Sequence, residues 1–303
     1  MIHLKLLLTA IFWGGTFIAG RMLAGHVHPV SASFLRFAIA SACLLMVLYK
    51  THGRVPVLPR RLWLPTLLLG LTGVFAYNIL FFAGLQSVPA GRASIIIANN
   101  PVMIALGAAL LFKHRLGPVK SLGVLISVCG AIVAISRGQV LSLFSGGIGP
   151  GDWLIFGCVL SWVSFSLIGK TVLNSIPPLV AITYAAIFGS LLLLVPALLS
   201  GLAGSLASYS LLDWVNMAYL GVFGTVMGFV WYYEGIEQIG PTRAGLFINF
   251  VPLSAIVMAH VILREPITWS LAAGTLLVIS GVYLTNNGLH WPVIWHSRLK
   301  PGH

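Results

Sequence analysis

The sequence predicts an all-α polytopic membrane protein with ten transmembrane helices arranged as two inverted five-helix repeats. Three observations support this fold class. Of the 303 residues, 58% are hydrophobic and only 7% are charged, which leaves too few charged groups to cover a soluble domain. Apolar runs of about 20 residues, long enough to cross a bilayer, recur along the whole chain. Residues in the second half also repeat the spacing of residues in the first.

Each expected helix is an apolar run bounded by Pro, Gly or charged residues. The ten expected spans are residues 4–23, 30–50, 62–85, 92–112, 117–136, 152–173, 179–201, 211–235, 242–263 and 267–288. The first run leads directly into further spans, so no cleavable signal peptide is expected. Connections are short except for residues 137–151, a Gly-rich segment at mid-chain where a link between two halves would lie.

Two constant offsets relate the halves of the chain. An offset of 151 residues aligns 73–130 with 224–281 without a gap, and an offset of 149 aligns the starts of the two halves. The matched pairs include Gly73 and Gly224, Arg92 and Arg243, Pro101 and Pro252, Gly123 and Gly274, Gly130 and Gly281, and Trp13 and Trp162. Chance similarity of glycine-rich helices is the alternative, but matched Pro, Arg and Trp positions favour a duplication. The expected units are a first repeat at 1–140, a linker at 141–151, a second repeat at 152–290 and a cytoplasmic tail at 291–303.

The number of spans in each repeat decides how the two copies are oriented. Five is odd, so the second copy enters the membrane from the face opposite the first. Inverted repeats of this kind are typical of transporters that work by alternating access, because the two copies can exchange conformations and open the protein to either side.

The distribution of cations predicts which loops are cytoplasmic, because Lys and Arg resist translocation. With the N-terminus in the cytoplasm, the inner loops and tails hold Lys5, Lys50, Arg54, Arg60, Arg61, Lys113, Arg115, Lys120, Lys170, Arg243, Arg298 and Lys300. The outer loops hold Arg21, Arg92, Arg137 and Arg264. Both termini are therefore expected in the cytoplasm, as an even number of spans requires.

Prolines inside the fourth and ninth spans mark one set of candidate functional residues. Pro101 and Pro252 remove a helical hydrogen bond and leave an earlier carbonyl without its usual partner, which in lipid has to be covered by protein or water. Asn99, Asn100 and Asn249 stand just before them, with amides that are costly to expose to acyl chains. We expect the prolines to act as hinges and the amides to line a substrate cavity. The alternative is a local kink whose amides cap the backbone or join helices.

Aromatic and small polar residues of the first, third, sixth and eighth spans form the second set. Trp13 and Trp162 lie near one-third depth, deeper than an ordinary interfacial belt. Residues 77, 78 and 81 share a helix face, and 231 and 232 occupy the matching turn of the eighth span. The candidate cavity wall is therefore Trp13, Thr16, Tyr77, Asn78, Phe81, Trp162, Ser166, Trp231 and Tyr232. Aromatic stripes more often serve packing, but the polar groups among them favour an amphipathic pocket.

Ionisable residues are expected mostly outside the membrane core. The five acids, Asp152, Asp213, Glu234, Glu237 and Glu265, are all expected at span ends or in loops, which predicts weak or absent ion coupling. His260 is the remaining proton-relay candidate, although a packed, hydrogen-bonded histidine near a helix end is the reading we favour. Arg36, two turns into the second span, is expected to snorkel outward or to pair with backbone carbonyls in a structural or gating role.

Several function classes lack support in the sequence. There is no HExxH motif, no embedded pair of carboxylates and no Walker lysine, so we expect neither an enzyme nor an ATP-driven pump. The cations form no basic stripe with interleaved aromatics, so no nucleic acid partner is expected. Cys43, Cys129 and Cys158 lie singly in apolar segments. The expected partners are a small-molecule substrate and the lipid bilayer, with no cofactor and no metal, and a monomer is the expected state.

The chain resembles the EamA family of the drug/metabolite transporter superfamily. The resemblance covers nearly the whole chain and rests on Trp13-Gly14 with Phe17, on Pro29, on the pair Arg36-Phe37, and on the segments 83–101 and 235–268 followed by Gly274 and Gly281. It implies a ten-helix inverted-repeat carrier of the inner membrane that moves small metabolites, often exporting amino acids, aromatic ones among them. It also implies a cavity built from spans 1, 3, 4, 6, 8 and 9. The first copy departs from the pattern at 113-KHR-115, which has no acid where the second copy has Glu265.

These observations together predict a secondary transporter that exports amino acids or similar zwitterions through a central cavity by alternating access. The asparagines would bind the ammonium and carboxylate groups, and the aromatic residues would form the apolar walls. The alternatives are a nucleotide-sugar or cationic-drug transporter, a polytopic membrane enzyme, and a subunit that moves no solute. Anionic sugars would require an Arg or Lys in the cavity and lipophilic cations an embedded acid.

Overall fold

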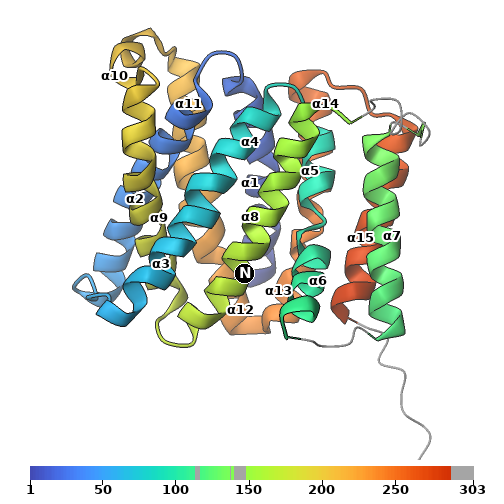
Figure 1. Cartoon of the computed structure of the whole chain (residues 1–303), viewed down its shortest axis with the longest axis horizontal. Coiled ribbons are helices and arrows are strands. Elements are labelled where there is room, and N and C mark those ends of the chain that lie inside the picture. Colours follow the sequence, from blue (N-terminus) through green and yellow to red (C-terminus); the bar gives the residue numbers. More distant parts are fainter. Residues whose placement is uncertain (113–116, 137, 140–147, 288–303) are drawn as a thin grey trace, which may run out of the picture.

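A computed structural model describes residues 1–112, 117–136, 138–139 and 148–287. Within this part of the chain the structure is helical and contains no strand. Its helices run side by side across one bundle (Figure 1). Ten helical segments are long and apolar enough to span a membrane, and their bounds agree with the ten expected spans to within a few residues. The protein is a multi-pass, all-α membrane protein.

The first half supplies five spans from nine helical elements. These are α1 Ile2–Leu23, α2 Pro29–His52, η1 Arg60–Leu62, α3 Trp63–Leu69, η2 Gly70–Ala76, α4 Tyr77–Leu85, α5 Ala90–Ile97, α6 Asn100–Phe112 and α7 Pro118–Ile135. The third span is continuous from η1 through α4. The fourth consists of α5 and α6.

The second half follows the same order. Its elements are α8 Pro150–Leu173, α9 Pro178–Leu199, α10 Leu202–Ser205, η4 Leu206–Ser208, α11 Leu211–Gly221, η5 Val222–Met227, α12 Gly228–Ile239, α13 Pro241–Ile248, α14 Phe250–Leu263 and α15 Trp269–Asn287. The eighth span joins α11, η5 and α12. The ninth consists of α13 and α14.

Equivalent spans carry the same backbone irregularity. The segments η2 and η5 are π-helical turns inside the third and eighth spans, and the 151-residue offset places η2 directly on residues 221–227. A π-turn frees backbone carbonyls from the α-helical pattern and often marks a functional site. Side chains bond two of these carbonyls: Asn78 Nδ2 donates to Val74 O at 2.8 Å, and Thr225 Oγ1 donates to Leu220 O at 2.9 Å.

The fourth and ninth spans are interrupted where the prolines predicted a break. The helix α5 ends at Ile97 and α6 begins at Asn100, while α13 ends at Ile248 and α14 begins at Phe250. At each break the chain tightens to an i→i−3 hydrogen bond, from Asn99 N to Ile96 O at 3.2 Å and from Asn249 N to Leu246 O at 3.3 Å. The break itself follows from proline chemistry, while movement about it remains a prediction.

The fifth and tenth spans pack through glycines in a reciprocal arrangement. A Cβ added at Gly123 of α7 would lie 2.7 Å from Gly281 O, and one added at Gly274 of α15 would lie 2.7 Å from Gly130 O. The 151-residue offset places Gly123 on Gly274 and Gly130 on Gly281, so it converts the first contact into the second. Close backbone approach of this kind is how small residues join helices in a membrane, and reciprocity of contacts is the mark of a two-fold relation. Because residue numbers rise along α7 as they fall along α15, the two equivalent helices run antiparallel.

Each loop between successive spans lies on one of the two faces of the bundle where the helices end. The face that carries the α1–α2 connection, here called the α1–α2 face, lies at the upper edge of Figure 1. The orientation of the protein in the bilayer stays a prediction. Five of the loop cations that predict it, Lys113, Arg115, Arg137, Arg298 and Lys300, lie outside the described residues, as do most of the expected linker and the expected tail.

Candidate functional site

The first span lies at the centre of the bundle, where it contacts elements of the third, fourth, eighth and ninth spans. Trp13 of α1 is fastened to the eighth span, because its indole Nε1 donates to Gly224 O of η5 at 3.1 Å. Thr16 is buried, and its hydroxyl donates to Trp13 O at 2.6 Å. The π-turn of the second repeat thus holds the tryptophan of the first.

Five aromatic rings from four helices form one connected group, here called the aromatic cluster: Trp13, Tyr77, Trp162, Phe229 and Tyr232. Ring centroids are 5.3 Å apart for Trp13 and Tyr232, 5.7 Å for Trp13 and Phe229, 6.4 Å for Phe229 and Trp162, and 5.5 Å for Trp162 and Tyr77. These distances suit offset or tilted aromatic pairs. All five side chains are only partly buried, so the cluster keeps accessible surface.

Two of the expected wall residues are not among these five rings. Phe81 is 1% exposed and packs against Phe17 and Phe82 and, with ring centroids 6.0 Å apart, against Tyr77 of the cluster. It therefore lies in the hydrophobic core directly behind the cluster, and its role in a cavity wall stays a prediction. Trp231 packs on Phe12 at 5.7 Å. Successive residues of a helix point about 100° apart, which explains why Trp231 leaves the cluster that its neighbour Tyr232 joins.

The serine of the sixth span and the charged groups near Trp231 have local partners. Ser166 is partly buried and donates to Trp162 O at 2.7 Å. Lys5 lies 5.9 Å from the Trp231 ring centroid and forms an ion pair with Glu234 at 2.6 Å. This pair joins α1 to α12 near the end of the eighth span.

Arg36 differs from its expected position. It is 8% exposed and does not snorkel: its Nη1 donates to Asn78 Oδ1 at 3.0 Å, and its Nε donates to Thr225 Oγ1 at 3.2 Å. Its partners are therefore side chains of the third and eighth spans and not backbone carbonyls. Thr225 lies within η5, and Asn78 lies in α4 just after η2. Both side chains also bond backbone carbonyls at these π-turns. The interior of this part of the bundle therefore contains a charged side chain.

The three asparagines at the helix breaks have different surroundings. Asn99 is buried with both amide atoms bonded, its Nδ2 donating to Ile95 O at 3.0 Å and its Oδ1 accepting from Ser127 Oγ at 2.7 Å. Asn249 is partly buried. Asn100 is partly buried, and its Oδ1 is enclosed without a hydrogen-bond partner among the described residues. Of the three, Asn100 has the strongest need for a further donor.

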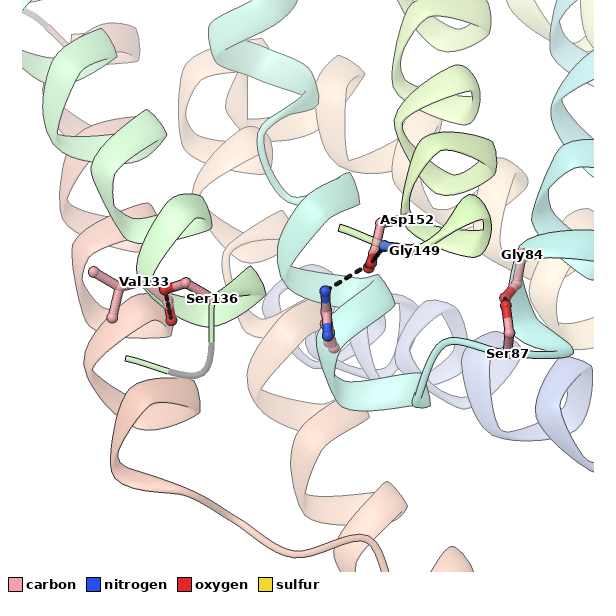
Figure 2. Close-up of polar contacts among 7 residues, drawn as sticks. Gly84, Ser87, Val133, Ser136, Gly149 and Asp152 are labelled. Atoms are coloured by element: carbon pink, nitrogen blue, oxygen red, sulfur yellow. Dashed lines mark hydrogen bonds and ion pairs between the residues drawn. The ribbon is translucent and has the colours of Figure 1, made fainter. Parts of the chain in front are cut away.

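Polar contacts join the two halves at the α1–α2 face. The Glu265 carboxylate, in the loop after the ninth span, accepts from Ala90 N at 2.9 Å and Gly91 N at 3.2 Å and so caps α5. Asp152 pairs with Arg92 Nη2 at 2.7 Å, and Figure 2 shows its carboxylate beside Gly149 at the start of α8. Anionic groups suit both helix N-termini. Asp152 and Glu265 thus join the two halves at this face.

A cavity of about 450 Å³ opens beside Glu265. Its lining consists of Arg21, Ala24, Gly25, Gln86, Leu263 and Glu265, so it lies at the α1–α2 face and not among the aromatic cluster. The Arg21 guanidinium donates to Leu85 O there. Nearby, the Nδ1 of His260 lies 2.9 Å from Glu265 O, so His260 is hydrogen-bonded near a helix end as expected, but it is exposed and not packed.

Sequence reasoning missed Phe229, Thr225 and the cross-half role of Glu265. Phe229 stands within the aromatic run 229-FVWYY-233, where the sequence does not show which ring faces inward. Thr225 and Glu265 act on residues more than 170 positions away. An intramembrane arginine is by default a functional candidate, and that signal was present at Arg36.

Ten spans, matched breaks in the helices and an aromatic cluster shared by both halves are features of a multi-pass membrane transporter. The profile of the EamA-like transporter family matches residues 1–136 and again residues 149–287. The chain belongs to the EamA-like transporter family, and it is a transporter, not an enzyme.

Relatives with known names agree with this assignment. The chain is 29% identical over 288 residues to an uncharacterized transporter, YyaM, of Bacillus subtilis, covering 95% of this chain and 94% of that protein. It is 28% identical over 286 residues to a probable terminal-alkyne amino-acid exporter of Streptantibioticus cattleyicolor, covering 93% and 92%. A probable amino-acid metabolite efflux pump of Salmonella typhimurium is 24% identical over 292 residues, with 92% of each chain covered. One solved crystal structure has the same fold, with a TM-score of 0.65 at 20% identity over 92% of this chain and 96% of that one.

Proposed function

We propose that this protein is a secondary transporter that exports amino acids or similar zwitterionic metabolites by alternating access through a central chamber. The observation that carries the proposal is the aromatic cluster, which unites the matched residues Trp13 and Trp162 with rings of the third and eighth spans. Partly exposed aromatic rings on converging helices suit a concave site for an organic substrate. Two relatives are named as exporters of amino acids or their metabolites.

The arrangement of the halves supports alternating access. The antiparallel course and reciprocal glycine contacts of α7 and α15 are what two inverted copies would produce. Copies related in this way can exchange conformations, and the protein then opens to the other side. Pro101 and Pro252 stand at the interruptions of the fourth and ninth spans, where hinge movement would meet little resistance from backbone hydrogen bonds.

Substrate contacts follow from the partly exposed rings of the cluster and from one amide oxygen without a partner. Tyr77, Trp162 and Tyr232 would stack against the apolar part of the substrate. Asn100 Oδ1, enclosed without a partner in the described chain, would accept a hydrogen bond from an ammonium group, with Asn249 placed at the matching break. All these groups come from one chain, so a monomer is the proposed working unit in the inner membrane, with both termini in the cytoplasm.

Counterflow in proteoliposomes tests the proposal, using a panel of amino acids, sugars and lipophilic cations. We expect uptake of amino acids by the wild type, and a loss of at least about tenfold in Trp162→Ala and Asn100→Ala, from lost stacking and hydrogen bonding. Trp153→Ala is the matched control, because Trp153 lies on the same helix as Trp162 but is 62% exposed. Uptake confined to sugars or cations, or an equal loss in Trp153→Ala, would contradict the proposal.

A further inference from the structure

Arg36 is a buried cation whose partners are neutral. It lies near the start of α2, is 8% exposed, and bonds an amide oxygen and a hydroxyl oxygen at 3.0 and 3.2 Å. The ion pairs found in the described part of the chain are Lys5 with Glu234, His26 with Asp213 and Arg92 with Asp152, none of which includes Arg36. A buried charge is strongly disfavoured unless an opposite charge compensates it. Arg36 is therefore suited to bind an anion.

The guanidinium also has donors to offer. It carries five N–H groups in a planar fork that matches a carboxylate, and its two hydrogen bonds engage Nε and Nη1. The third nitrogen, Nη2, faces Gly224, since a Cβ added at Gly224 would lie 3.9 Å from it. Gly224 brings no side chain of its own to this point, and the nearest atom there is the Thr16 methyl carbon, 2.6 Å from the added Cβ.

Gly224 connects Arg36 to the aromatic cluster. Its carbonyl accepts from Trp13 Nε1 at 3.1 Å, and Asn78, which bonds Arg36, directly follows Tyr77 of the cluster. Arg36 thus borders the cluster through η5 on one side and through the start of α4 on the other. A substrate whose apolar part stacks in the cluster would bring its charged end close to the guanidinium.

The other repeat has no such cation. A Cβ at Gly221 would meet Arg36 O at 3.0 Å, and a Cβ at Gly70 would meet Ala185 O at 2.9 Å. Gly221 and Gly70 are matched by the 151-residue offset, and Arg36 and Ala185 by the 149-residue offset, so these are equivalent contacts. One junction carries a guanidinium and the other a methyl group, and the chamber would therefore bind a single carboxylate in one orientation.

We propose that Arg36 binds the substrate carboxylate, so that this transporter selects molecules with one carboxylate group beside an apolar or aromatic body. The inference rests on the proposed function and specifies its binding site. It replaces the expectation that the asparagines alone bind both ends of a zwitterion: Asn100 would serve the ammonium group, and Arg36 the carboxylate.

Competition against labelled phenylalanine in proteoliposomes tests the role of Arg36, using phenylalanine and phenylalaninamide, which lacks the carboxylate. We expect the wild type to prefer phenylalanine by about 10- to 100-fold, the worth of a charge-assisted pair of hydrogen bonds. Arg36→Gln should bind phenylalanine as weakly as the amide, while the affinity for the amide stays within about twofold. Arg36→Lys, which keeps the charge but loses the fork, should retain part of the preference.

Asn78→Asp separates substrate binding from a structural bridge. An aspartate at position 78 would pair with Arg36 inside the protein, so a bridging role predicts unchanged or better stability and transport. Carboxylate binding by Arg36 predicts the same stability result but the opposite transport result. The Asn78→Asp protein should melt at the same or a higher temperature in detergent, yet it should lose its preference for phenylalanine over the amide. Retained preference in Asn78→Asp, or an equal loss for acid and amide in Arg36→Gln, would overturn the inference.

A thermal-shift measurement keeps the two proposals distinct. 3-Phenylpropionate should raise the unfolding temperature of the wild type but not of Asn78→Asp, and 3-phenylpropanamide should raise neither. If the wild type moves no amino acid but shows this pattern, the proposed substrate class fails and the carboxylate site stands. If the wild type moves amino acids but the acid and the amide act alike, the site fails and the proposed function stands. Chloride that abolishes the shift would assign Arg36 to inorganic anions and overturn the carboxylate role.

Discussion

Replacement of Glu265 by Gln should favour conformations in which the two halves have separated, or opened, at the α1–α2 face. Both carboxylate oxygens accept backbone N–H groups at the start of α5, at 2.9 and 3.2 Å, so a residue of the second half caps a helix of the first. Glutamine keeps one acceptor oxygen, and it loses the negative charge and one hydrogen bond. The loss of a charge at a helix N-terminus together with a charge-assisted hydrogen bond corresponds to about 1–2 kcal/mol.

That free energy sets the size of the observable change. If the contact exists only while this face is closed, its loss shifts the balance of open and closed states by about 5- to 30-fold. Ser94 of α5 is a suitable reporter, because it is buried one turn from Gly91. In a background without the native cysteines, Ser94→Cys should react with an impermeant maleimide about 5- to 30-fold faster when Glu265→Gln is present.

Glu237→Gln provides the matched control, because it makes the same chemical change at an exposed position. It should leave the labelling rate at Ser94→Cys unchanged. Equal labelling with and without Glu265→Gln would show that the cap on α5 persists in all conformations, and would refute its assignment as a fastening that opens during transport.

Two further predictions concern the packing of spans and the break in the ninth. Gly281→Ala should lower the free energy of unfolding by about 1–3 kcal/mol, because its Cβ would overlap the Ser127 backbone nitrogen. Thermal melts in detergent measure this loss, and Gly204→Ala, whose Cβ would meet nothing within 4 Å, should show none. Pro252→Ala should restore a helical hydrogen bond across the break at Asn249. We expect it to slow transport while substrate affinity stays within about twofold. Unchanged counterflow rates would argue against a hinge at this break.

The sequence predicted those features of the fold that depend on local chemistry. The ten spans follow from hydropathy and length, and the breaks in the fourth and ninth spans follow from Pro101 and Pro252, since proline lacks a backbone donor. The π-turns η2 and η5 contain no proline and were not predicted. Their glycines are compatible with an ordinary helix, and only packing against other spans distinguishes the two forms.

The candidate site was predicted in part. Trp13, Tyr77, Trp162 and Tyr232 come together as expected: Trp13 and Trp162 occupy matched positions of the two repeats, and Tyr232 and Tyr77 lie on the spans that pack beside them. Their roles in transport remain predictions. The surroundings of Arg36 could not be foreseen, since its partner Thr225 is 189 positions away and the choice between snorkelling and burial depends on which spans surround it.

The polar contacts of Asp152 and Glu265 between the two halves also bear on the direction of transport. The acids Asp152 and Glu265 hold the α1–α2 face, whereas the matched positions 3 and 114 are both histidine. The two copies therefore differ in charge at these positions, as they do at Arg36 and Ala185. A carrier built this way would rest in the orientation that its peripheral charges prefer, and carboxylates moved from one rim to the other could invert that resting state while the chamber and its selectivity stayed intact.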